Sequence, residues 1–145
     1  MTDPPDAATP DRRPWTDQPL WRVGLVTALA AAAASVLVYE VARAAGVPME
    51  LTEVFEDEYE RMPLINMAFG ALLDGGVAGT ALAVACRRWA RRPRSSFVAL
   101  TVIGLIASFV LPVISDGTTA TKVVLSISHI VVAIIIVPAL ALGPV

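Results

Sequence analysis

The sequence lacks the residues on which disulfide frameworks, metal centres and most enzymes depend. It has one cysteine, Cys86, and one histidine, His129. A single cysteine excludes an internal disulfide and a multi-cysteine metal site, so a metal would have to be held by carboxylates. The short motifs of serine hydrolases, zinc proteases, P-loop proteins and dinucleotide-binding enzymes are also absent. We therefore expect a protein that is not an enzyme and that holds no cofactor or metal.

Aromatic and charged residues are scarce as well, and aliphatic residues fill most of the chain. Aromatic residues make up 6% and charged residues 17% of the 145 residues, whereas 56% are hydrophobic. The mean hydropathy is +0.68. Soluble domains have an apolar share of roughly 45–50%, even when glycine is counted. The composition therefore indicates an integral membrane protein.

Four apolar segments are each long enough to cross the bilayer as a helix, which takes ~20 residues. They cover about residues 21–45, 62–86, 95–115 and 119–142. We therefore predict an all-α fold, a four-helix transmembrane bundle over residues 20–145. Residues 1–19, rich in Pro, Asp, Thr and Arg, predict a disordered cytoplasmic tail. Small residues around Ala34 and Ser35 leave a cleaved signal peptide as an alternative to a retained first helix.

The basic residues predict the orientation of the chain in the membrane. Arg12, Arg13 and Arg22 precede or begin the first segment. The connection between the second and third segments carries five more arginines, which are Arg87, Arg88, Arg91, Arg92 and Arg94. Because cytoplasmic connections are enriched in basic residues, we expect both termini on the cytoplasmic side of the cell inner (plasma) membrane, in a multi-pass protein.

The same five arginines have two compatible interpretations. Retention of the connection in the cytoplasm is sufficient to explain them. Contact with anionic lipid headgroups, at about 1 kcal/mol per basic residue, is the functional alternative. Binding to nucleic acid is not expected, because no nucleic-acid-binding module accompanies the arginines.

The connection between the first and second segments is acidic. Its acidic residues are Glu50, Glu53, Glu56, Asp57, Glu58 and Glu60, with Arg61 as the only basic one. Leu51, Phe55, Tyr59 and Met62 recur at steps of four and three, which predicts a short extracytoplasmic amphipathic helix. We interpret the acidic residues as a solvated surface, with a divalent-cation site as the alternative.

Two ionisable residues, Asp74 and His129, interrupt otherwise apolar membrane segments. Asp74 follows Pro63 by 11 residues and His129 follows Thr119 by 10, so both lie about 15–16 Å deep, near the middle of the bilayer. Ionisable side chains at this depth are costly and usually face the interior of a bundle, where they find a partner. We therefore predict an intramembrane polar centre formed by Asp74 and His129. Its further candidate members are Asn66, Ser108 and Ser126.

This polar centre has a structural and a functional interpretation. Hydrogen bonds among these residues would hold two helices together. A carboxylate beside an imidazole would instead titrate near physiological pH, as the groups of proton relays do. Gly75 and Gly79 form a GxxxG motif on another face of the same helix, which permits close packing within the bundle or between two protomers.

The last third of the chain has a distinctive pattern. A short polar link, residues 115–122 (SDGTTATK), precedes a last helix with a central histidine in residues 128–133 (SHIVVA) and a proline near its end in residues 136–138 (IVP). In this pattern the chain resembles an uncharacterised family of small bacterial four-helix integral membrane proteins. The resemblance implies four membrane helices and no assigned activity.

Our leading hypothesis is a non-enzymatic accessory or scaffold protein of the lipid bilayer, which packs against a membrane-protein partner or forms a homo-oligomer. The alternative is a small proton-coupled transporter or channel-like oligomer that uses an Asp74–His129 pair.

Overall fold

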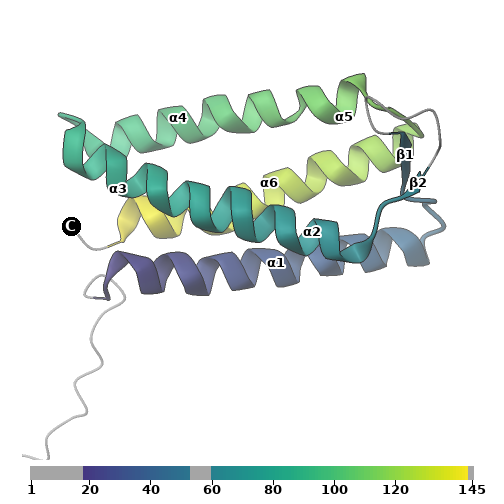
Figure 1. Cartoon of the computed structure of the whole chain (residues 1–145), viewed down its shortest axis with the longest axis horizontal. Coiled ribbons are helices and arrows are strands. Elements are labelled where there is room, and N and C mark those ends of the chain that lie inside the picture. The colour runs from purple at the N-terminus through teal and green to yellow at the C-terminus, as the bar shows by residue number, and fades with distance from the viewer. Residues whose placement is uncertain (1–17, 53–59, 144–145) are drawn as a thin grey trace, which may run out of the picture.

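Four long helical segments run back and forth along one axis, as Figure 1 shows. The computed structural model describes residues 18–52 and 60–143, so only the last two residues of the predicted disordered tail are described. The segments are α1 (Leu20–Ala44), α2–η2–α3 (Leu64–Gly70, Ala71–Ala78 and Gly79–Trp89), α4–α5 (Pro93–Ser108 and Val110–Ile114) and α6 (Thr119–Leu142). Each segment is long and apolar enough to cross a membrane. The predicted all-α, four-helix membrane fold is confirmed.

The helices begin where the local sequence favours it. Pro63 precedes α2 in an extended conformation, and Pro93 occupies the first turn of α4, where its missing N–H costs nothing. Thr118 caps α6, because its hydroxyl accepts a hydrogen bond from the backbone N–H of Thr121 at 3.2 Å. These three helix starts lie at the borders between the polar connections and the apolar spans.

Three short strands close one end of the bundle, at the right of Figure 1. β1 (Glu50–Thr52) lies between β2 (Glu60–Arg61) and β3 (Asp116–Gly117) and pairs antiparallel with both. Glu50 is opposite Arg61, and Leu51 is opposite Gly117. The sheet therefore joins the connection between α1 and α2 to the connection between α5 and α6.

The prediction of an amphipathic helix in the acidic connection is wrong at both of its ends. Residues 50–52 and 60–61 are extended, and residues 53–59 lie outside the described part of the chain. The prediction relied on the helical spacing of apolar residues within this one connection. The strands instead exchange backbone hydrogen bonds with each other and with a connection more than fifty residues away, which local periodicity does not reveal.

Small residues on α1 let the other helices approach it closely. A Cβ atom placed on Gly76 of η2 would contact Ala28, and one placed on Gly24 would contact the side chain of Thr80. Ala31 and Ser35 are also buried on α1. In a membrane, where lipid is as apolar as leucine, such close packing rather than hydrophobicity associates helices.

The fourth segment, α6, lies at the centre of the bundle, and the third segment, α4–α5, lies at its edge. α6 contacts α1, η2, α3, α4 and α5, whereas α4 packs mainly on α3 and α6. Consequently α4–α5, along the top of Figure 1, exposes much of its apolar surface, including Ile103, Ile106 and Val113. These side chains are suited to contact with lipid.

The second segment contains an eight-residue π-helix, η2, with Asp74 inside it. Its register is visible at its end, where the backbone N–H of Gly79 bonds to the carbonyl of Asp74, five residues earlier. π-Helical turns are rare, widen the helix locally and are frequent at functional sites. Asp74 thus lies at a local irregularity of an otherwise regular membrane helix.

Candidate functional site

Asp74 projects from the middle of the second span onto the outside of the bundle. Its side chain is exposed, and it makes no hydrogen bond or ion pair with any residue that the structure describes. The prediction that Asp74 lies in an enclosed polar centre is therefore wrong, because its side chain is on the outside of the bundle. The rotation of η2 explains this, because Gly75 and Gly76, rather than Asp74, face the neighbouring helices.

His129 is half-buried and is held by its own helix. Its Nδ1 lies 2.8 Å from the carbonyl oxygen of Leu125, one turn earlier on α6. Because a carbonyl only accepts hydrogen bonds, Nδ1 carries the proton in this contact, and Nε2 is the acceptor in the neutral ring. The ring also packs edge-on against Phe109 between α4 and α5, with centroids 6.4 Å apart. His129 therefore faces the third segment.

Asp74 and His129 nevertheless lie on neighbouring turns of adjacent helices. Gly75 packs against Val132, since a Cβ at Gly75 would be 2.8 Å from the Cγ1 of Val132. The second and fourth segments both start at the sheet end and run in the same direction (Figure 1). Asp74 precedes Gly75 by one residue and His129 precedes Val132 by three, so the two lie within about one helical turn in height. Within the described residues, no hydrogen bond or ion pair joins them.

The other candidate members of the polar centre do not connect these two residues. Ser108 donates to the carbonyl of Leu105 at 2.7 Å, and Ser126 donates to the carbonyl of Lys122 at 2.9 Å. Both bonds stay within one helix. Asn66 lies exposed in the first turn of α2, near the sheet end. The structure thus separates the members of the predicted polar centre. Ser108, Ser126 and His129 bond to their own helices, and Asp74 has no partner among the described residues.

A polar contact that the sequence analysis missed joins the first and last helices. Ser128 of α6 and Ser35 of α1 are both buried, and their hydroxyl oxygens are 3.3 Å apart. The sequence indicates one half of this contact, because small residues form a stripe on α1. They are Gly24, Ala28, Ala31 and Ser35. That stripe marks a packing face, but its partner on α6 depends on how both helices are rotated.

The glycines of the GxxxG motif pack inside the bundle. Gly75 contacts Val132 and Ile136, and a Cβ at Gly79 would lie 3.5 Å from Ile136 and 3.6 Å from Leu140. Both glycines therefore allow η2 and the start of α3 to approach α6. Of the two predicted uses of this motif, the structure has packing within one protomer.

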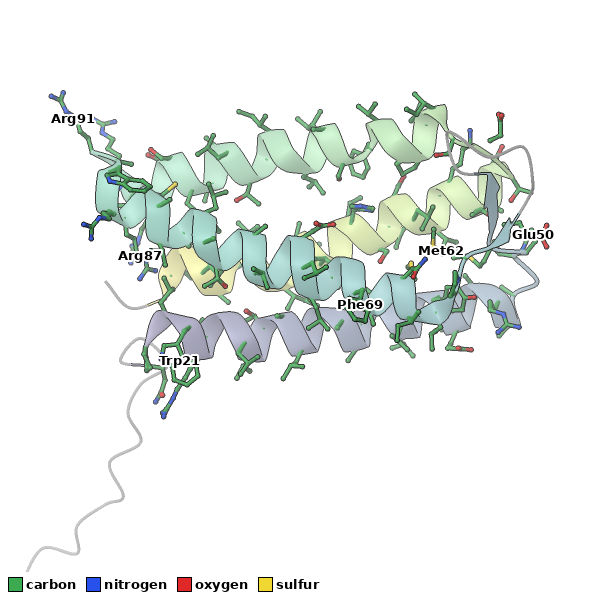
Figure 2. The ribbon with its side chains drawn as sticks, viewed as in Figure 1. Trp21, Glu50, Met62, Phe69, Arg87 and Arg91 are labelled. Atoms are coloured by element: carbon green, nitrogen blue, oxygen red, sulfur yellow. The ribbon has the colours of Figure 1, made fainter. Side chains whose placement is uncertain are left out.

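The arginines of the α3–α4 turn divide into two groups. Arg87 reaches the end of α6, where its Nη2 donates to the carbonyls of Leu140 at 2.9 Å and Gly143 at 3.2 Å. It thus binds carbonyls that the helix terminus leaves without an intrahelical partner. Arg88, Arg91, Arg92 and Arg94 are exposed. Figure 2 shows Arg87 directed into the bundle end and Arg91 pointing away from it.

The described residues contain no group of three or more His, Cys, Asp or Glu side chains arranged to hold a metal ion. The candidate divalent-cation site consists of Glu53, Glu56, Asp57 and Glu60. The first three lie outside the described part of the chain, and Glu60 lies in β2.

Comparisons with known proteins show the family of the chain and assign no activity. No curated protein and no solved structure matches the chain. One protein family matches residues 16–143, a range that includes all four helical segments. The family matched is one of unknown function, as the resemblance in the last third of the sequence implied. The chain belongs to the family of unknown function DUF6069.

Proposed function

We propose that this chain is a non-enzymatic accessory or scaffold protein of the membrane, which assembles with a further membrane-spanning segment at Asp74. The observation that supports this proposal is the unpaired carboxylate. Asp74 lies mid-span, exposed on the side of the bundle, without a partner among the described residues. An ionised aspartate at the centre of a membrane helix costs about 2.5–3.5 kcal/mol on insertion scales. A hydrogen-bond donor or cation on a second segment would offset that cost.

The other polar side chains of the bundle fit assembly better than conduction. Ser108, Ser126 and His129 each bond to a carbonyl of their own helix. No chain of side-chain hydrogen bonds therefore leads away from Asp74 through the described residues. The proposal includes a location in the cell membrane with both termini in the cytoplasm, supported by the arginines of the α3–α4 turn.

A small proton-coupled transporter is the second candidate. It is favoured by the π-helix around Asp74 and by the height of His129, which lies within about one turn of it. With Nδ1 bound to Leu125, the Nε2 atom of His129 is the position at which the neutral ring would take up a proton. Carboxylates and imidazoles at this depth are the groups from which intramembrane proton relays are built.

Substitution of Asp74→Asn tests both candidates, because it removes the charge and nearly preserves the shape. For an accessory protein, the complex extracted in mild detergent from membranes of the native host should lose mass in the variant, as measured by native mass spectrometry. Asn66→Ala, an exposed polar residue near the end of the same span, is the control and should leave the complex unchanged.

A flux measurement separates the two candidates. Proteoliposomes with an internal pH dye should show the same proton flux for the native protein and Asp74→Asn if the role is assembly. An intact complex combined with a lost flux would replace the accessory role by the transporter. Unchanged complex mass together with unchanged flux would contradict both.

A further inference from the structure

A cavity of about 370 Å³ lies at the end of the bundle opposite the sheet, where α3 turns into α4 and α6 ends. Its lining includes three arginines, Arg87, Arg92 and Arg94, and apolar residues such as Phe97 and Leu140. No aspartate or glutamate is among the described residues that line it. The cavity is therefore amphipathic, with positive charge on its polar side.

The positive charge in the cavity is not neutralised by the described part of the chain. Arg87 uses Nη2 for the carbonyls of Leu140 and Gly143, which carry no full charge. Arg94 lies near enough to Arg87 for the two like charges to interact unfavourably. Within the described residues none of the three arginines forms an ion pair with a carboxylate. An anion in the cavity would relieve this repulsion.

The start of α4 adds donors to the same space. α4 has 16 residues and begins at Pro93, and Arg94 and Ser95 line the cavity. The backbone N–H groups of a first helical turn have no intrahelical acceptor, and the helix dipole adds partial positive charge there. Guanidinium groups beside such amides suit phosphate oxygens, which arginine binds in a bidentate manner.

The apolar wall indicates which phosphate compound fits. Phe97 and Leu140 are buried against Ala83 and Cys86, in the main apolar cluster of the bundle. The cavity also lies between the end of one candidate membrane span at Trp89 and the start of the next at Pro93. Span termini lie at the level of the lipid headgroups. A ligand there has its charge among the arginines and its apolar part along the helices.

We propose that this cavity binds the headgroup of an anionic phospholipid, whose phosphate is held by Arg92, Arg94 and the first turn of α4, and whose acyl chain follows the apolar wall. Arg87 supports the site by holding the end of α6 in place. The site is separate from Asp74 and does not depend on the function proposed above.

The test is a titration of the purified protein with phosphatidylglycerol or phosphatidylcholine, followed by native mass spectrometry. Arg92→Gln combined with Arg94→Gln removes two cavity charges while leaving Arg87 in place. Arg88→Gln combined with Arg91→Gln is the matched control, since it removes two exposed charges of the same turn that do not line this cavity.

The native protein and the control should retain one phosphatidylglycerol molecule and discriminate against phosphatidylcholine. The cavity variant should bind phosphatidylglycerol roughly tenfold to thirtyfold more weakly, as expected for the loss of two basic contacts to an anionic headgroup. An equal loss in the control, or equal retention of both lipids, would overturn the proposal. Displacement of the lipid by millimolar inorganic phosphate would also overturn it, in favour of a soluble phosphate ligand.

Discussion

At the scale of single residues, several hydroxyls in the bundle bond within their own helix. Thr27 donates to the carbonyl of Val23 at 2.7 Å, and Thr101 donates to Phe97 at 2.8 Å, as Ser126 does to Lys122. Such bonds satisfy a polar group in an apolar medium without specifying a neighbour. The contact between Ser35 and Ser128 differs, because it joins α1 to α6 in a buried position.

We predict that Ser128→Ala lowers the free energy of unfolding by about 0.6 kcal/mol, the average for hydrogen bonds between membrane helices. Adding Ser35→Ala should cost little more, because the two hydroxyls share one bond. Ser126→Ala is the control and should be near neutral, since Ser126 bonds only to its own helix. Unfolding by SDS in bicelles measures the single variants Ser35→Ala and Ser128→Ala, the double variant and the control. A fully additive double variant would contradict the shared bond.

At the scale of elements, small residues rather than polar ones determine how the second segment is rotated. Gly75 and Gly79 face α6, and Gly76 faces α1. Asp74 is thereby turned outward, together with its neighbour Leu73, which is also exposed. The polarity of Asp74 alone predicted an inward orientation, and the glycine packing decided otherwise.

We predict that Gly75→Ala destabilises the bundle by about 1–3 kcal/mol, because the added methyl group collides with Ile136 and Val132. Gly104→Ala on α4 is the matched control. A Cβ at Gly104 would have no atom within 4 Å, so we expect no loss of stability there. Thermal unfolding in detergent compares the two variants, and equal midpoints would show that η2 and α6 are not in close contact.

At the scale of the whole molecule, charge is distributed unevenly between the two ends of the bundle. The α3–α4 turn carries Arg91, Arg92 and Arg94, whereas the sheet end carries Glu50 and Asp116. Because cytoplasmic connections of membrane proteins are enriched in arginine and lysine, this asymmetry predicts that the arginine end faces the cytoplasm. The arginine cavity is at the end predicted to face the cytoplasm, where anionic lipids are concentrated.

We predict that the sheet end faces away from the cytoplasm. In a Cys86→Ser background, Asp116→Cys should react with a membrane-impermeant maleimide on intact cells. Trp89→Cys, which keeps every arginine and replaces a side chain that is 78% exposed, should react only after permeabilisation. The opposite order of labelling would contradict the predicted orientation.

The positions of the membrane helices could be predicted closely, whereas the acidic connection and the polar centre could not. The predicted ranges 21–45, 62–86, 95–115 and 119–142 begin and end within three residues of the observed segments. The number of residues from the start of each helix predicted that Asp74 and His129 lie at a similar height, because the rise per residue of a helix is constant. Their directions, the π-helix of η2 and the pairing of β1 with β3 all depend on contacts between distant parts of the chain.

The sequence by itself determined four helices that are long and apolar enough to cross a bilayer, because apolar length is carried by each run of residues independently of the others. Only the tertiary structure decided which polar groups meet. It brought Ser35 to Ser128 and Arg87 to the end of α6, and it left Asp74 facing outward. The physical reason is that close packing at glycine and alanine sets the rotation of each helix, and rotation determines which side chains are neighbours.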